Sequence, residues 1–168
     1  MVNAHFSAFK KNISHPIRFR VFMLTRLPSA WFAGLKLVSL TTEEAKVSVR
    51  QKWFNKNPFR SIYVAILSMP SEVSTGVLCM GAIYNRKPPL SMLVISNEGF
   101  YYKKATGTIV FTCNEGAAIN DAVERAIQTG EATTIRCHTI GTNEKGEVVA
   151  EFYYTWSFKQ KGSAKVAG

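Results

Sequence analysis

Glu72 is the residue best placed to do chemistry, because it is the only charged side chain in the apolar stretch 61–83. Burial among apolar neighbours raises the pKa of a carboxyl group toward neutral pH, where it serves well as a general base or as a direct nucleophile. On a regular helix its face also carries Ser68, Thr75 and Gly76, which we expect to hydrogen-bond the carboxylate or to line the space for a bound substrate. The alternative is a structural carboxylate that is paired with a buried arginine or a hydroxyl group.

A second reactive group is expected where the same helix begins. The first amides of a helix lack an intrahelical partner and lie at the positive end of its dipole, so they stabilise an oxyanion that forms nearby. In this chain they are the amides around Arg60, Ser61 and Ile62. Asn57, in the loop before them, is expected either to cap the helix or to orient a water molecule or the substrate.

The cysteines and histidines do not indicate a metal site or another catalytic site. Cys79, Cys113 and Cys137 are far apart, form no CxxC pair and have no histidine at ligand spacing. We therefore expect three core cysteines, no disulfide or metal site, and a reducing, cytoplasmic compartment. No histidine lies at a recognisable motif spacing from the serines near Glu72, so no nucleophilic triad is predicted.

Positive charge is concentrated in the first sixty residues. The net charge is +10, and no acidic residue precedes Glu43. This excess is typical of proteins that bind a phosphate-bearing partner, an anionic membrane surface or nucleic acid, although a solvated basic face has the same composition. No nucleic-acid-binding module is recognisable, so no nucleic-acid partner is expected, whereas contact of the basic N-terminus with a membrane surface stays open. The N-terminus lacks a clean apolar secretory signal, and we interpret it as part of the mature domain.

Hydrophobic periodicity predicts the elements that position these residues. A helix-like pattern predicts one or two short basic helices before Pro28, and the apolar run 61–83 predicts a buried helix rather than a membrane span. Period-two alternation predicts most of the remaining chain as strands. The predicted strands are 34–40, 45–53, 90–105, 107–113, 131–141 and 148–159, with an amphipathic helix at 114–130.

Several antiparallel strands and one fully apolar helix imply a curved sheet wrapped round that helix, an α+β arrangement. The length of 168 residues and the hydrophobic share of 46% suit one domain. We assign 1–160 to this domain, with a basic helical segment over about 1–27, and 161–168 to a flexible tail. One face of the second strand is predicted to carry Val47, Val49, Gln51 and Trp53.

The order of these elements resembles the hotdog fold, in which a six-stranded antiparallel sheet wraps round a long helix. Residues 52–76, KWFNKNPFRSIYVAILSMPSEVSTG, are similar to an uncharacterised thioesterase-like family of that superfamily. Its members carry a Trp near an Asn-rich loop and an acidic residue further along the helix. The last strand, GEVVAEFYYTWSFK, is similar to that of the same family. The resemblance covers about residues 27–159.

The resemblance implies a function and a role for each site residue. It places Glu72 where related acyl-CoA thioesterases have a catalytic Asp or Glu, and Asn57 where the family has a loop Asn. The family usually has glycine near the position of Arg60, which lets the backbone approach the thioester carbonyl. The expected function is hydrolysis of a thioester of coenzyme A or acyl carrier protein. The alternative is a non-catalytic module that binds acyl-CoA or a fatty acyl ligand.

The resemblance also implies the assembly and the substrate contacts. Active sites of this superfamily lie between subunits, so a homodimer or a dimer of dimers is expected. In such a dimer, basic residues near loops would meet the phosphates and adenine of coenzyme A. These residues are Lys56, Arg86 and Lys87. No cofactor is expected, because coenzyme A is part of the substrate.

Overall fold

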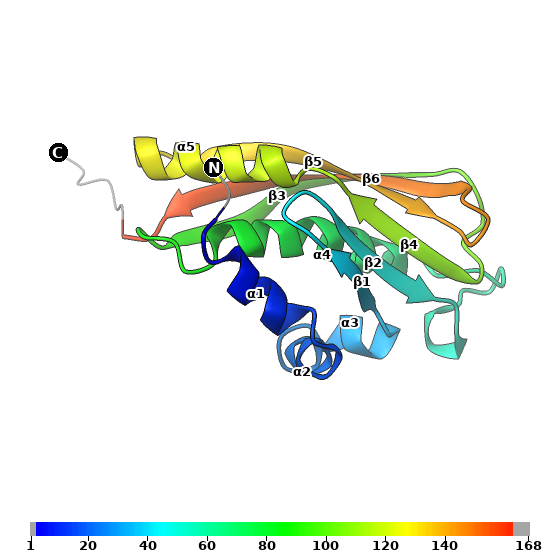
Figure 1. The fold of residues 1–168 in the computed structure, drawn as a ribbon. Coiled ribbons are helices and arrows are strands. Elements are labelled where there is room, and N and C mark those ends of the chain that lie inside the picture. Colours follow the sequence, from blue (N-terminus) through cyan, green and yellow to red (C-terminus); the bar gives the residue numbers. More distant parts are fainter. Residues whose placement is uncertain (1–2, 163–168) are drawn as a thin grey trace.

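Six antiparallel strands form one curved sheet that wraps round a single long helix, α4 (Val64–Ile83) (Figure 1). The computed structural model describes residues 3–162. The strands are β1 (Lys36–Leu40), β2 (Ala45–Arg50), β3 (Leu90–Tyr101), β4 (Thr108–Cys113), β5 (Thr133–Thr142) and β6 (Val148–Gln160). Their order across the sheet is β1-β2-β4-β5-β6-β3. This architecture confirms the predicted α+β class.

Three short helices precede the sheet, and one further helix lies between β4 and β5. The helices are α1 (Phe6–Ile13), α2 (Pro16–Arg26), α3 (Pro28–Ala33) and α5 (Gly116–Thr129). Pro16 and Pro28 stand in the first turns of α2 and α3, where the missing amide hydrogen breaks no helical bond. One or two helices are expected before Pro28; the structure has two, α1 and α2, and α3 is an additional helix that the pattern does not indicate.

α4 is the core helix, as its apolar composition predicts. It is long and apolar enough to cross a membrane, but 72% of its most apolar window is buried inside the fold. Its two buried serines contact hydroxyl groups of the sheet. Ser71 Oγ lies 2.8 Å from the hydroxyl of Tyr154, and Ser74 Oγ lies 2.8 Å from Thr139 Oγ1. A helix surrounded by protein can therefore hold serines without leaving a polar group unpaired.

The second strand is shorter than its alternation predicts. β2 ends at Arg50, and Trp53 lies instead in a short 3-10 turn, η1 (Trp53–Asn55), with 80% of its surface exposed. The cause is the buried side chain of Asn55. It accepts a 2.7 Å hydrogen bond from the amide of Lys52 and donates one of 2.8 Å to the carbonyl of Arg50. These local bonds replace the sheet ladder and turn the chain outward.

The inner face of the sheet supplies much of the core. The buried side chains of β6 alternate with half-exposed neighbours, as predicted. They are Phe152, Tyr154, Trp156 and Phe158. The three cysteines are also buried and free. Of the predicted tail, 161–162 form a turn, and 163–168 lie outside the described residues.

The N-terminal helices are anchored to the end of α4. The buried side chain of Asn3 donates 2.8 Å hydrogen bonds to the carbonyls of Gly81 and Tyr84. Gly81 also lets Phe6 approach, since a Cβ atom there would lie 2.6 Å from the Phe6 ring. α1, α2 and α3 thereby cover the side of α4 that faces away from the sheet (Figure 1).

The two edge strands of the sheet differ. β1 has five residues, whereas β3 has twelve and pairs within the sheet on one side only, with β6. β3 also exposes apolar side chains, because Leu93 and Ile95 are 65% and 53% exposed. A long edge of this kind is a template for pairing with another strand.

Candidate active site

Glu72 lies on the wall of a pocket between α4 and the junction of α2 and α3. The pocket has a volume of about 300 Å³ and a mostly apolar lining. It is lined by Arg26, Leu27, Pro28, Ser29, Ala30, Met69, Glu72 and Val73. Glu72 therefore borders a space that a small apolar group can occupy.

The Glu72 carboxyl group is half-buried and unpaired. Burial raises its pKa above the ordinary value of 4.5, because apolar surroundings solvate the charged form poorly. Within residues 3–162 its side chain has no hydrogen-bond or ion-pair partner, and the exposed Arg26 across the pocket does not pair with it. The structural alternative requires such a partner, so the arrangement favours a chemical role.

Gly76 and Trp156 shape the space beside the carboxylate. A Cβ atom at Gly76 would lie 3.2 Å from Glu72 Oε1 and 3.5 Å from the Trp156 ring, so the missing side chain makes room for both. The indole N–H of Trp156 donates a 2.9 Å bond to Thr75 Oγ1, and that hydroxyl donates to the carbonyl of Glu72. Thr75 is fully buried. It therefore positions Trp156 and is closed to a substrate, whereas Gly76 borders the carboxylate.

Ser68 lies one turn before Glu72 and ties α4 to β6. Its hydroxyl donates to the carbonyl of Ala65 at 2.7 Å, and its own carbonyl accepts a 3.0 Å bond from the hydroxyl of Tyr154. Burial raises the pKa of Tyr154 to about 12, so the phenol stays protonated and continues to donate. This bond holds the turn next to Pro70, which has no amide hydrogen of its own to donate.

The amides predicted to form an oxyanion hole are all engaged within the protein. The amide of Arg60 donates to the carbonyl of Asn57, and that of Ser61 donates to the side-chain oxygen of Asn57 at 3.1 Å. The amide of Ile62 donates to the carbonyl of Ala105 at 2.8 Å. The predicted role of these amides is therefore corrected, because a donor already used by the loop cannot polarise a substrate carbonyl.

The unpaired amides lie further along the chain, because α4 begins at Val64 and not near Ser61. The amide of Tyr63 still donates to the carbonyl of Asn55, at 2.8 Å. In the described part of the chain, the amides of Val64 and Ala65 have no acceptor, and both residues are exposed. They lie at the positive end of the α4 dipole, so they are the candidate oxyanion donors.

The loop geometry explains why a glycine suits the position of Arg60. Arg60 has a left-handed backbone with φ of 60°, which glycine adopts without strain. Asn57 holds the same turn, because its side-chain oxygen accepts hydrogen bonds from the amides of Phe59 and Ser61. Asn57 therefore stabilises the loop and does not cap α4. Arg60 stands where the family usually has glycine. Its own amide donates to the carbonyl of Asn57 and is therefore not available to a substrate.

The basic residues predicted to meet coenzyme A do not gather round Glu72 within one chain. Arg86 forms a 2.7 Å ion pair with Glu124 and, like Lys87, lies beyond the C-terminal end of α4. That end is about 16 Å from Glu72 along the helix axis. Lys56 is exposed in the loop before α4.

Two parts of this site are missing from the sequence-based prediction: the α2–α3 junction and Trp156. The alternation of the last strand places Trp156 on the inner face of the sheet, but nothing local relates it to Glu72. Pro28 signals the start of a helix, but the element against which that helix packs is a long-range property. Both contacts depend on how α4 crosses the sheet.

A family model described as Domain of unknown function (DUF4442) matches residues 17–158 of this chain. No curated protein matches the sequence. The matched range includes β1 to β5 and most of β6, and it excludes α1 and the last two residues of β6. The pocket residues on α2, α3 and α4 are therefore within the family domain.

Several solved structures share the fold. A protein of unknown function from Pseudomonas aeruginosa, described as a probable thioesterase, is 18% identical with a TM-score of 0.74, over 89% of this chain and 99% of that chain. A thioesterase from Haemophilus influenzae is 8% identical with a TM-score of 0.59, over 83% and 88%. The E. coli PaaI protein from the phenylacetic acid degradation operon is 14% identical with a TM-score of 0.59, over 86% and 94%. These similarities confirm the hotdog fold.

Proposed function

Because this chain belongs to the DUF4442 family and has the hotdog fold, we propose that it hydrolyses an acyl thioester, with Glu72 as general base or nucleophile. The observation that carries the proposal is the Glu72 carboxyl group, which is half-buried beside an apolar pocket, has a raised pKa and has no partner in residues 3–162. Such a carboxylate is a stronger base than one in water and is free to act on a substrate. The thioesterase names of two proteins with this fold support the class of reaction.

The proposed substrate is an acyl group carried by coenzyme A or acyl carrier protein. The acyl group occupies the Glu72 pocket, whose volume of about 300 Å³ lies at the lower end for ligand sites and favours a short chain. Gly76 lets the carboxylate lie close to the helix, since a Cβ atom there would be 3.2 Å from Glu72 Oε1. Lys56, in the loop before α4, is the basic residue best placed to meet the phosphates of a carrier.

The reaction uses two groups of α4. Glu72 removes a proton from a water molecule, and the oxygen attacks the thioester carbonyl. The oxyanion that forms accepts hydrogen bonds from the free amides of Val64 and Ala65. When the tetrahedral intermediate collapses, the carbon–sulfur bond breaks, and the leaving thiolate takes up the proton. The products are a carboxylic acid and a free thiol.

Within one chain, Glu72 and the amides of Val64 and Ala65 are too far apart to act on the same carbonyl. Ala65 and Glu72 are separated by two helical turns, about 10 Å along the axis, whereas oxyanion donors act at about 3 Å. We infer that a second copy places the start of its α4 opposite Glu72, so the functional unit is a homodimer. The exposed edge of β3, with Leu93 and Ile95, is the proposed pairing surface.

The test is the release of free thiol from acyl-CoAs of increasing chain length. Val64→Pro removes one proposed oxyanion donor and should lower kcat about 100-fold to 1,000-fold. Proline is tolerated here because Val64 is the first residue of α4 and Tyr63 before it is extended, with ψ of 136°. Val64→Ala keeps the amide and is the matched control. Equal rates for the two variants would contradict the assignment of the amide.

Mixing subunits tests the shared site. Glu72→Gln and Val64→Pro homodimers are each expected to be inactive. After exchange of subunits, half of the dimers carry one intact site, so activity should recover to about a quarter of the wild-type value. A mixture that stays inactive would place both groups in one chain and refute the inferred geometry. Wild-type protein that binds acyl-CoA but releases no thiol at any chain length would be a non-catalytic binding module.

A further inference from the structure

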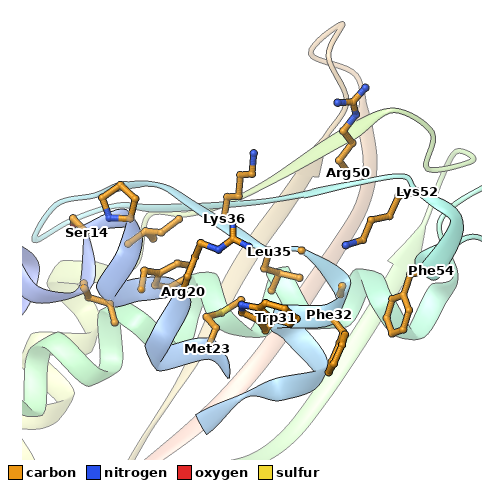
Figure 2. Close-up of a pocket in the computed structure, with 16 residues that line it drawn as sticks. Ser14, Arg20, Met23, Trp31, Phe32, Leu35, Lys36, Arg50, Lys52 and Phe54 are labelled. Atoms are coloured by element: carbon orange, nitrogen blue, oxygen red, sulfur yellow. The ribbon is translucent and has the colours of Figure 1, made fainter. Parts of the chain in front are cut away.

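A second and larger cavity lies at the other end of α3 (Figure 2). It has a volume of about 840 Å³ and lies between α1–α3, the β1–β2 hairpin and η1. It shares no lining residue with the Glu72 pocket. We call it the basic pocket, after the four cationic residues of its lining: Arg20, Lys36, Arg50 and Lys52.

The wall of the basic pocket is apolar and aromatic. Phe32 and Phe54 are 53% and 49% exposed, with ring centroids 6.0 Å apart, and Trp31 meets Phe32 edge-on at 5.0 Å. Buried apolar side chains such as Met23 and Leu35 also line the cavity. Large aromatic rings left exposed round a hollow of this size are typical of a ligand site.

The four cations of the basic pocket have no counter-charge. No acidic side chain lines the cavity, and none of the four forms an ion pair within the described residues. Lys46, on the same hairpin, is by contrast paired with Glu44 at 3.0 Å. Like charges gathered at one rim repel each other, so a bound anion would be stabilised there.

Two of these cations, Arg20 and Lys52, turn inward over the aromatic wall, whereas the other two extend outward from the rim (Figure 2). The Arg20 guanidinium lies 6.0 Å from the centre of the Trp31 ring, and Lys52 Nζ lies 6.0 Å from that of Phe54. Gly34 makes room for the ammonium group, since a Cβ atom there would lie 2.7 Å from Lys52 Nζ. The cations that would bind the anionic half of a ligand therefore lie next to the aromatic side chains that would contact its apolar half.

We propose that the basic pocket binds one amphiphile with a single chain and an anionic head group, a long-chain fatty carboxylate. The head lies between Arg20 and Lys52, and the chain lies along Met23 and Leu35. A hollow with an apolar lining suits a single chain, whereas a membrane surface or a nucleic acid is bound on a broad exposed face. The proposal concerns a site separate from Glu72 and does not depend on thioester hydrolysis.

Quenching of Trp31 fluorescence by 9,10-dibromostearate tests the proposal. The background variant is Trp53→Phe, because Trp53 is 80% exposed while Trp156 is 4% exposed. Saturable quenching at concentrations below micelle formation is expected, and Trp31→Phe should remove it. Glu72→Gln should leave it unchanged. Quenching that persists after Trp31→Phe must come from Trp156, which lies near Glu72; it would place the acid in the Glu72 pocket and overturn the proposal.

Charge variants test the head group. The double variant Arg20→Gln, Lys52→Gln should bind the brominated acid about tenfold more weakly, given the modest strength of exposed charge contacts. Both residues are exposed, so the fold should be retained. Lys10→Gln, Lys11→Gln makes the same change of net charge on α1, outside the pocket, and is the matched control. Equal affinity for the two double variants would refute the assigned head-group site.

Competition by twelve-carbon amphiphiles separates the possible ligands. Laurate should displace the probe, and each methylene from octanoate to laurate should strengthen binding by up to about fourfold. Dodecyl phosphate shares the anionic chemistry, and stronger displacement by it would assign the head as a phosphate monoester. Equal displacement by dodecanol or dodecyltrimethylammonium would refute an anion site. Quenching by vesicles of brominated phosphatidylglycerol but not by the free acid would refute the proposal and assign a membrane surface as the ligand. Displacement of the probe by an RNA oligonucleotide would refute it in favour of a nucleic acid.

Discussion

Replacing Glu72 with glutamine should stabilise the protein while it removes the proposed activity. Glutamine keeps the shape of the side chain but carries no charge, so it removes both the proposed base and the cost of a poorly solvated carboxylate. A structural carboxylate would behave in the opposite way, because its loss would break a bond that holds the fold. The two interpretations of Glu72 therefore predict stability changes of opposite sign.

The size of the stability change follows from the surroundings of the carboxylate. Burying a charged group without a partner costs more than burying a neutral polar group such as glutamine, and because Glu72 borders an open pocket this difference is small, about 1 kcal/mol. We expect Glu72→Gln to raise the free energy of unfolding at pH 7 by about 1 kcal/mol. For a chain of this length that corresponds to a rise in Tm of about 2–4 °C. Removal of a general base should lower kcat about 100-fold to 10,000-fold.

The gain in stability should depend on pH. The folded protein keeps the proton on Glu72 to a higher pH than the unfolded chain does, because burial raises its pKa above 4.5. The wild type therefore loses stability as the pH rises from 4.5 through the raised pKa, whereas the glutamine at this position does not titrate. The difference between variant and wild type should be absent below pH 4.5 and complete once the pH exceeds the raised pKa.

Thermal and urea unfolding of both proteins across pH 4–8, together with thiol release from acyl-CoA, measures these effects. The acid limb of the pH–rate profile should report the raised pKa of Glu72. A variant that is less stable than the wild type at pH 7 would refute the argument that the carboxylate is unpaired. A stability difference that does not change with pH would refute the role assigned to its desolvation. Retained activity would remove Glu72 from the mechanism.

Three further substitutions test the site, the loop and the assembly. Gly76→Ala introduces a Cβ atom 3.2 Å from Glu72 Oε1 and should lower kcat/KM about 10-fold to 100-fold with an unchanged circular dichroism spectrum; full activity would contradict the close approach. Arg60→Gly relieves a left-handed residue and should raise the free energy of unfolding by about 0.5–1 kcal/mol in urea melts, and a loss of stability would speak against the loop geometry. Leu93→Lys, on the edge of β3, should yield monomers in light scattering. The control Val38→Lys, at a 55% exposed position on β1, should leave the mass of the dimer unchanged. The same mass for both variants would argue against pairing through β3.

The fold was predictable from sequence because its main signals are local. The apolar composition around Glu72 indicates a buried helix, and period-two alternation identifies most strands. Trp53 shows where such reasoning fails, because the alternation of β2 continues through it in the sequence. The side chain of Asn55 bonds the backbone of Lys52 and Arg50 and ends the strand earlier. A side chain that competes with the sheet ladder leaves the hydrophobic pattern unchanged.

The candidate site was predictable in part. An isolated carboxylate in an apolar helix is visible in the sequence, so Glu72 could be singled out. The oxyanion donors could not be, because the start of α4 depends on hydrogen bonds such as that from the amide of Ile62 to Ala105, which is distant in the chain. The same is true of the pocket walls, since α3 and Trp156 reach Glu72 only through the packing of α4 between the sheet and the N-terminal helices.

A thiol-release assay of this protein needs no correction for the protein's own cysteines while the fold is intact. Cys79, Cys113 and Cys137 are fully buried, and burial raises the pKa of Cys113 to about 12 and that of Cys79 well above its usual range. Only a thiolate attacks a disulfide dye, so these thiols give no background signal while the fold is intact. Without substrate, any slow colour change counts molecules as they unfold. The same dye therefore measures the rate of the proposed reaction and, without substrate, the rate at which the protein unfolds.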